Sequence, residues 1–368
     1  MSTLKQPGSN WRQAAAMAVG FVAVLYAGDR VLSRLHLPDI YGTRNGCRLA
    51  WDRFEQSKGP YNVVYLGCSY EWYGISPRVV DAQASRLSGM DVRSLNLSSS
   101  AASMVTNYLL ARRIVESGRL PKVVYLDVSP DATDVSQRNW LRHGLRALGD
   151  IRDLPVAASV GRDVIVETLL SATFSSYCRW DDMGIAAGRV VLAAPVHPTL
   201  KMRFDDRGWA EWIGGKRELP AFAPSILDAP ASNRGSWGTP RSGDPNAVAL
   251  RRTIEMLQAA GVTVRLLEMP MASVAPPWDR HDRNHAYRAF VNAAIEGLDV
   301  RIVRPPAEAV VDADFFDPIH LNPEGAAKFS RWLADDVVEA VSASASNPVH
   351  DAMAKSRNAN GQANEIPQ

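Results

Sequence analysis

Cysteine is scarce in this 368-residue chain, and its scarcity excludes two common kinds of site. The three cysteines, Cys47, Cys68 and Cys178, are an odd number at no metal-ligand spacing, so at most one disulfide can form and a zinc site is not expected. The histidines give no better ligand set, since His281 and His285 are four residues apart and have no third ligand nearby. We therefore expect no metal.

The chain also lacks a large excess of charge of either sign. Its formal net charge at pH 7 is +2, and no stretch is basic enough to follow a phosphate backbone. Nucleic acid is therefore not an expected partner. The length and the 46% of hydrophobic residues suffice for one large core or two modest ones.

One apolar run near the N-terminus is a candidate membrane segment. The run "AAAMAVGFVAVLYAG" extends from Ala14 to Gly28 and follows Lys5 and Arg12. It matches the core of a signal peptide better than a full membrane span, which needs about 20 residues. No small-x-small cleavage site follows it, however, and apolar residues resume at Val31. The run predicts an uncleaved signal anchor, with a cleaved signal peptide or a buried soluble helix as alternatives.

The rest of the chain divides by composition. We expect a cytoplasmic tip and signal-anchor helix over 1–35, a linker over 36–60, one catalytic domain over 61–341, and a disordered tail over 342–368, which lacks apolar periodicity. Positive side chains flank the apolar run on both sides, so the charge balance does not decide the orientation. Because the anchor is first and alone, we expect an extracytoplasmic, periplasmic domain.

From residue 61 onward, short apolar runs alternate with helical segments. The predicted strands cover residues 61–66, 91–97, 122–128, 262–268 and 300–305. Strands separated by helices predict an α/β fold with a doubly wound, five-stranded parallel sheet. Residues 131–245 break this rhythm with Pro- and Gly-rich loops, so they form a large insertion after the third strand. In it, Trp209 and Trp212 could line a lid, although core packing is the simpler reading.

Two short segments carry the candidate chemistry. In a parallel sheet the carboxyl ends of the strands meet at one edge, so Ser69, which follows the first strand, can converge with the late pair Asp317 and His320. A serine hydroxyl needs a histidine to accept its proton and a carboxylate to orient the imidazole. Cys68 is the rival nucleophile, but the spacing from the preceding glycine favours Ser69, and we expect Cys68 to be a small buried residue. Asn322 is expected to cap the last helix.

The segments "GCSYEWYGISP" and "DPIHLNPEG" resemble the SGNH/GDSL hydrolase superfamily. In that superfamily a Gly-x-Ser turn after the first strand supplies the nucleophile, and a late Asp-x-x-His supplies the other two groups. The likeness is nearest to a divergent membrane-anchored branch, which includes alginate O-acetylation and teichoic-acid D-alanylation proteins. It covers residues 60–130 and 246–340 and implies a flavodoxin-like SGNH fold for them.

The resemblance also implies an oxyanion hole. Backbone N–H groups of Ser69 or Tyr70 and of Ser98 would be its donors. The third-block asparagine of the superfamily has no counterpart here, and Ser129 or Asn96 is the nearest polar side chain. Removal of one such donor typically lowers the rate by about 10²–10³-fold.

Trp72 and Tyr73 follow the nucleophile in the chain and could stack on a sugar ring. The superfamily's aspartate before the nucleophile is Cys68 in this sequence.

These features together predict an acyltransferase without a cofactor. The acyl group, expected to be acetyl, would rest on Ser69 and pass to a hydroxyl of a cell-surface polysaccharide. The resemblance implies a multi-pass membrane acyltransferase as a possible donor of the acyl group. Two alternatives remain: a carbohydrate esterase or deacetylase of the same fold, and a non-catalytic partner in polysaccharide export or assembly.

Overall fold

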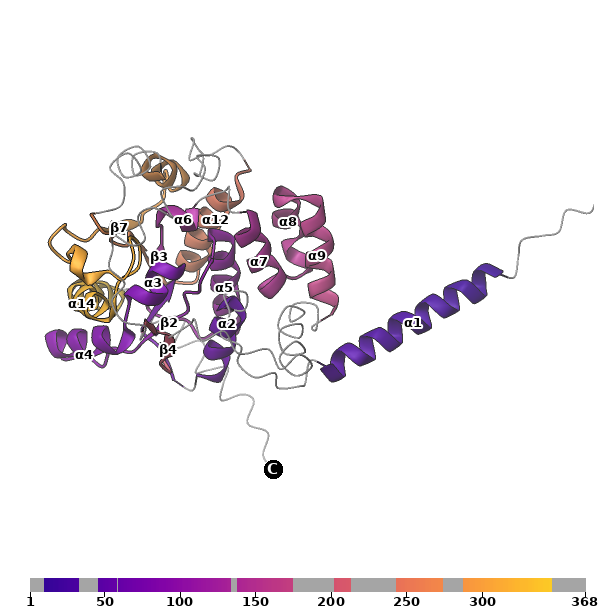
Figure 1. The fold of residues 1–368 in the computed structure, drawn as a ribbon, viewed down its shortest axis with the longest axis horizontal. Coiled ribbons are helices and arrows are strands. Elements are labelled where there is room, and N and C mark those ends of the chain that lie inside the picture. The colour runs from indigo at the N-terminus through magenta and orange to yellow at the C-terminus, as the bar shows by residue number, and fades with distance from the viewer. Residues whose placement is uncertain are drawn as a thin grey trace, which may run out of the picture.

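The computed structural model describes residues 10–32, 46–57, 59–133, 138–174, 202–212, 243–273 and 287–345. Figure 1 shows an α/β domain and an N-terminal helix. The predicted tail is described only as far as Ala345, where the last helix ends, and His281 and His285 lie outside the described residues.

The apolar run lies in helix α1 (Asn10–Leu32), whose apolar side chains are largely exposed, although Asp29 near its end is buried. Met17, Phe21 and Val24 are each more than 60% exposed. Among the described helices, α1 alone is long and apolar enough to cross a membrane, with a mean hydropathy of 1.4 over Gln13–Val31. The structure therefore confirms an apolar N-terminal helix, which is suited to a membrane anchor or to a signal sequence.

The five predicted strands form one parallel sheet in the order β2-β1-β3-β6-β7. Their bounds are Val63–Leu66 (β1), Ser94–Asn96 (β2), Val123–Asp127 (β3), Thr263–Leu267 (β6) and Arg301–Val303 (β7). In this register Tyr65 of β1 lies between Asn96 of β2 and Tyr125 of β3. The carboxyl ends of these three strands therefore meet at one edge of the sheet.

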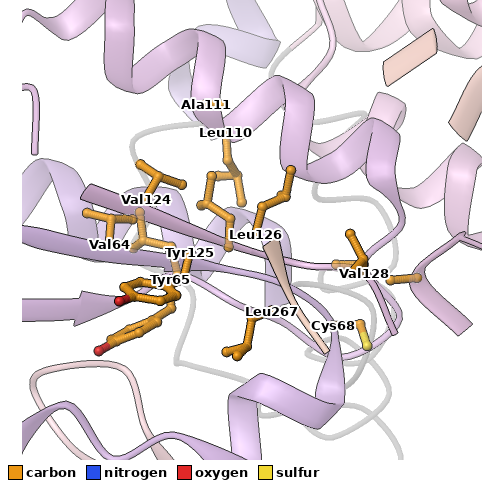
Figure 2. Close-up of a cluster of buried hydrophobic side chains, with 14 of the residues drawn as sticks. Val64, Tyr65, Cys68, Leu110, Ala111, Val124, Tyr125, Leu126, Val128 and Leu267 are labelled. Atoms are coloured by element: carbon orange, nitrogen blue, oxygen red, sulfur yellow. The ribbon is translucent and has the colours of Figure 1, made fainter. Parts of the chain in front are cut away.

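Helices cover both faces of the sheet, so the doubly wound prediction is confirmed. Helices α4 (Pro77–Ser88) and α14 (Pro323–Ala345) pack on one face, and α5 (Met104–Ser117) and α12 (Pro245–Ala259) on the other. Figure 2 shows the alternation of side chains that this requires: Leu126 points toward Leu110 of α5, whereas Tyr65 and Tyr125 point to the opposite side. There the hydroxyl of Tyr125 donates to Asp336 of α14 over 2.6 Å.

The segment 36–60 is not a linker throughout, because residues Gly46–Gln56 form helix α2. Its Cys47, Trp51 and Phe54 side chains are at most 7% exposed and belong to the hydrophobic core of the domain. These residues are four and three positions apart, so they share one face of the helix. The linker prediction is wrong because this stripe is long enough to dock a helix on the domain.

The insertion after β3 also contributes to the core in its first part. The described helices of this part are α6 (Pro130–Thr133), α7 (Arg138–Leu148), the 3₁₀ turn η1 (Ile151–Asp153), α8 (Leu154–Val160) and α9 (Arg162–Thr173). Helix α7 packs against α5 and α2 and buries Leu141 and Leu145. Further along the insertion, β4 (Met202–Phe204) and β5 (Ala210–Trp212) pair as an antiparallel hairpin.

Candidate active site

The candidate nucleophile lies where β1 turns into a short helix. The chain leaves β1 at Leu66 and enters helix α3 (Ser69–Gly74) through Gly67 and the N-cap residue Cys68. Only glycine fits this turn, because a Cβ atom on Gly67 would overlap Oε2 of Glu71. The absence of a side chain therefore allows the first residue of α3, Ser69, to stand at the carboxyl end of the sheet.

The three predicted catalytic residues form a continuous hydrogen-bonded chain. The Nε2 atom of His320 lies 2.8 Å from Oγ of Ser69, and its Nδ1 atom lies 2.7 Å from Oδ2 of Asp317. With the ring proton on Nδ1, the imidazole donates to the carboxylate and accepts from the serine hydroxyl. The serine is 251 residues before the histidine, so the fold itself brings them together.

A local turn fixes the carboxylate behind the ring. Oδ1 of Asp317 accepts hydrogen bonds from the backbone N–H groups of Ile319 and His320, at 2.9 and 2.8 Å. Burial alone raises the pKa of Asp317, but the hydrogen bond from the imidazole, its charge and the two backbone N–H groups outweigh burial and hold this pKa below its ordinary value. Asn322 caps α14 as predicted, accepting from the N–H of Gly325 at 2.9 Å.

Aromatic rings enclose the imidazole. Phe316 stacks on His320 with ring centroids 5.5 Å apart, and Tyr73 meets the ring edge-on at 4.9 Å. Tyr70 lies 5.8 Å away on a third side. Burial, with a smaller contribution from the charge of Asp317, raises the pKa of Tyr73 to about 12. The hydroxyl of Tyr73 is therefore uncharged at neutral pH.

Two of the predicted oxyanion donors are already engaged. The backbone N–H of Ser98 donates to Oδ1 of Asn96 at 2.9 Å. The Nδ2 group of Asn96 donates in turn to the carbonyl oxygens of Glu71 and Ile75, at 3.0 and 3.2 Å. Asn96 therefore fastens the loop after β2 to α3, and neither it nor the N–H of Ser98 is available to an oxyanion in this conformation.

The beginning of α3 offers better donors. Ser69 and Tyr70 occupy its first two positions, where backbone N–H groups have no acceptor inside a helix. Because they are at or next to the serine in the chain, these amides are the candidates for an oxyanion hole. Ser129 is buried, and its hydroxyl makes no hydrogen bond within the described part of the chain, so no contact ties it to the triad.

Beneath the nucleophile lies a buried carboxyl pair that the sequence analysis did not anticipate. Oδ2 of Asp127 accepts from the backbone N–H of Cys68 at 3.1 Å and from its thiol at 3.0 Å, and Oδ1 accepts from the N–H of Ser129 at 2.6 Å. Glu71 receives one hydrogen bond, from the hydroxyl of Ser98 at 2.9 Å, and its Oε1 atom has none within the described residues. Both side chains are fully buried.

The two carboxyl groups receive different hydrogen bonds, and these affect their pKa values differently. Burial raises the pKa of both, but two backbone N–H groups and a thiol donate to Asp127, which favours its ionised form. The charge of Asp127 raises the pKa of Glu71 further, and one hydroxyl donor does not offset this, so its pKa lies well above its ordinary value. Of the two carboxyl groups, Glu71 is therefore the one whose surroundings favour the protonated form more strongly. A lone acidic residue in the aromatic segment "YEWY" was the signal for it.

The hairpin of the insertion lies against α3. The indole N–H of Trp209 donates to the carbonyl oxygen of Tyr73 at 2.8 Å, and Phe204 packs on Trp72 with ring centroids 5.3 Å apart. Trp209 is thus partly buried against the core, as expected. Trp72 is only 7% exposed, so most of its surface is used in packing. The side chain of Trp212 is outside the described part.

No group of three metal-ligating side chains could hold an ion among the described residues. Comparison of the chain with protein-family models and with curated proteins gives no match.

Proposed function

We propose that this chain is a serine acyltransferase of the SGNH/GDSL kind, which carries an acyl group on Ser69 and transfers it to hydroxyls of a cell-surface polysaccharide. The observation that supports the proposal is the hydrogen-bonded chain from Ser69 through His320 to Asp317. These are the three groups that activate a serine for attack on a carbonyl, in the order that the chemistry needs.

The reaction takes place in two half-reactions. In the first, Oγ of Ser69 attacks the acyl carbonyl carbon while Nε2 of His320 accepts the hydroxyl proton, which it then gives to the leaving group. In the second, His320 removes the proton from a sugar hydroxyl, the sugar oxygen attacks the acyl-serine, and the proton returns to Ser69. Asp317 stabilises the imidazolium in both, and the first amides of α3 stabilise the oxyanion.

Exclusion of water separates transfer from hydrolysis, because the triad serves both. Ser69 is 8% exposed, and the rings of Tyr73 and Phe316 pack on its hydrogen-bond partner His320. An acyl-serine in such a site is protected from bulk water until an acceptor enters. We expect the apolar helix α1 to tether the domain at the outer face of a membrane, where a multi-pass acyltransferase could supply the acyl group.

The test is to follow both half-reactions with the full-length protein. A burst of 4-nitrophenol from 4-nitrophenyl acetate, together with labelling of Ser69 by a fluorophosphonate, is expected from the native protein and not from Ser69→Ala. Addition of a polysaccharide fragment should then yield its acetyl ester faster than free acetate. Faster release of acetate would indicate an esterase, and a folded protein with neither burst nor label would refute the proposal.

A further inference from the structure

Two adjoining hollows form a groove between α2 and the hairpin. The inner hollow, of about 290 Å³, is lined by Trp72, Ser98 and Phe204 among others. The outer hollow, of about 470 Å³, extends to Tyr61 and Gln56. Leu49, Arg53 and Asp206 line both hollows, so they form one groove.

Successive ring contacts connect this groove to the triad. Tyr73 meets the imidazole of His320 at 4.9 Å between centroids, Trp72 lies 5.6 Å from Tyr73, and Phe204 lies 5.3 Å from Trp72. Trp72 is in α3, three residues after Ser69, so both are on the same side of that helix. The inner hollow therefore lies on the side of α3 that carries Ser69, separated from the imidazole by the packed rings of Trp72 and Tyr73.

The groove is held open by bonds to the sheet. The backbone N–H of Asn96 donates to the carbonyl oxygen of Arg207 at 2.8 Å, and the guanidinium of Arg207 donates to the carbonyl oxygen of Ser94 at 3.0 Å. With the Trp209 indole bond to α3, these contacts fix the turn of the hairpin at the edge of β2. A groove formed in advance does not have to be ordered when a ligand binds.

The charges along the groove are paired. Asp52 contacts Arg48 at 3.0 Å, and Asp206 contacts Arg78 at 2.5 Å. Asp205 has Arg78 at 3.7 Å, beyond hydrogen-bond distance, and its Oδ2 atom is buried with no hydrogen-bond partner within the described part of the chain. Asp205 and Asp206 share Arg78, and Arg53 lines both hollows, so the groove has no excess of one sign that would attract a polyion.

We propose that this groove binds the acceptor as an uncharged, hydroxyl-rich oligosaccharide chain, which extends from the triad past Trp72 and Arg53 toward Tyr61. The chemistry is that of sugar recognition: apolar ring surfaces pack on the C–H groups of a sugar, and paired carboxylates, guanidiniums and amides bind its hydroxyls. The inference rests on the acyl transfer proposed above and adds the elements that bind the acceptor. These elements are α2 and the hairpin.

Binding and chemistry are tested separately in the full chain. The binding probes are a short neutral hexose oligosaccharide and an oligouronate of equal length, titrated calorimetrically into the Ser69→Ala protein. The groove is blocked by Leu49→Trp, which enlarges a half-buried residue shared by both hollows. The matched control is Leu87→Trp on the exposed side of α4. The chemistry is followed as the 4-nitrophenol burst and as acetyl transfer to the neutral oligosaccharide.

We expect the neutral oligosaccharide to bind better than the oligouronate, and Leu49→Trp to weaken its binding about tenfold or more, which is about 1.4 kcal/mol. Leu87→Trp should bind as the parent does. In proteins that retain Ser69, Leu49→Trp should lose transfer to the oligosaccharide, whereas Leu87→Trp should keep both the burst and the transfer. A groove that binds the oligouronate better, or binds the neutral chain equally well after Leu49→Trp, overturns the inference while the burst still stands. Loss of the burst in the native protein would refute the acyl chemistry instead. The calorimetric titration would still show whether the groove binds the neutral oligosaccharide.

Discussion

The thiol of Cys68 lies 3.0 Å from Oδ2 of Asp127, whereas the hydroxyl of the next residue, Ser69, faces His320. The two adjacent side chains thus have different hydrogen-bond partners. The thiol contacts the buried carboxylate of Asp127, and the hydroxyl contacts the imidazole of His320. This difference supports the serine as the proposed nucleophile, and it places the cysteine in the turn before it.

The first prediction separates these two side chains. Ser69→Ala should lower kcat/KM by about 10⁴-fold or more, because the attacking atom is removed. Cys68→Ser keeps a donor to Asp127 and should retain activity and fluorophosphonate labelling. Steady-state kinetics with 4-nitrophenyl acetate measures both. Loss of labelling in Cys68→Ser, with an unchanged circular dichroism spectrum, would assign the chemistry to the thiol.

The second prediction concerns the carboxylate behind the imidazole. Asp317→Asn should lower kcat by about 10³–10⁴-fold with little change in KM, because an amide no longer fixes the ring tautomer or stabilises the imidazolium. Asp312→Asn is the control, since Asp312 bonds Ser273 and not the triad. Equal rates for the two variants would show that Asp317 has no part in catalysis.

The same variant should change the pH dependence of stability. The folded-state pKa of Asp317 is below its ordinary value, so its contribution to stability is complete above an unfolded pKa of about 3.9 and is lost as the pH falls through the folded value. The unfolding free energies of the parent and Asp317→Asn should therefore converge in acid. Urea titrations across the acid range measure this, and a constant difference would contradict the shift.

The third prediction tests the proton on Glu71. Its folded-state pKa is raised by burial and by Asp127, so the folded protein holds a proton that the unfolded chain releases above about pH 4.3. Stability should then decline with rising pH, by at most about 1.4 kcal/mol per pH unit. Glu71→Gln cannot titrate and should lack this decline.

Ser98→Ala provides the matched comparison for Glu71. The hydroxyl of Ser98 donates to Glu71 and lowers its pKa, so removal of that hydroxyl should extend the decline to higher pH. Parallel stability curves for the parent and Glu71→Gln between about pH 5 and pH 8 would mean that Glu71 is ionised in the fold.

The fourth prediction concerns the contact between the β4–β5 hairpin and strand β2. Gly208 has φ +94°, and a Cβ atom there would overlap the carbonyl oxygen of Asn96. Gly208→Ala should displace the hairpin from β2 at a cost of about 1–2 kcal/mol or more. The 4-nitrophenol burst should persist, because the triad does not include the hairpin, while acetyl transfer to the oligosaccharide falls. Loss of both activities in a folded protein would instead make the hairpin part of the catalytic centre.

The fifth prediction tests whether α2 belongs to the domain. Phe54 is 2% exposed in the core, so Phe54→Ala should lower the unfolding free energy by about 3–5 kcal/mol. Glu55→Ala, on the exposed side of the same helix, should change it by about 0.5 kcal/mol or less. Denaturation in urea gives both values, and equal effects would mean that α2 does not contribute to the core.

Much of the sheet could be read from the sequence, because its signals are local. Each strand is a short apolar run, and Gly89 and Gly118 end the helices α4 and α5 in the left-handed conformation, as such glycines commonly do. The convergence of Ser69 and His320 followed from topology, since parallel strands end at one edge.

The failures came from contacts that no local pattern specifies. The engagement of the Ser98 N–H and of the Asn96 side chain depends on the packing of two loops, which periodicity does not reveal. Helix α2, in contrast, could have been predicted from a local pattern, because Cys47, Trp51 and Phe54 follow a helical spacing.

The position of α2 also limits how far the domain can lie from helix α1. Helix α2 is docked on the domain, and only residues 33–45 separate it from α1. Fully extended, a segment of this length spans about 50 Å at most. If α1 is the anchor that we propose, this length is the upper limit on the distance between α2 and the bilayer surface. The proposed acyl-serine could then meet a polymer only within the reach of this tether.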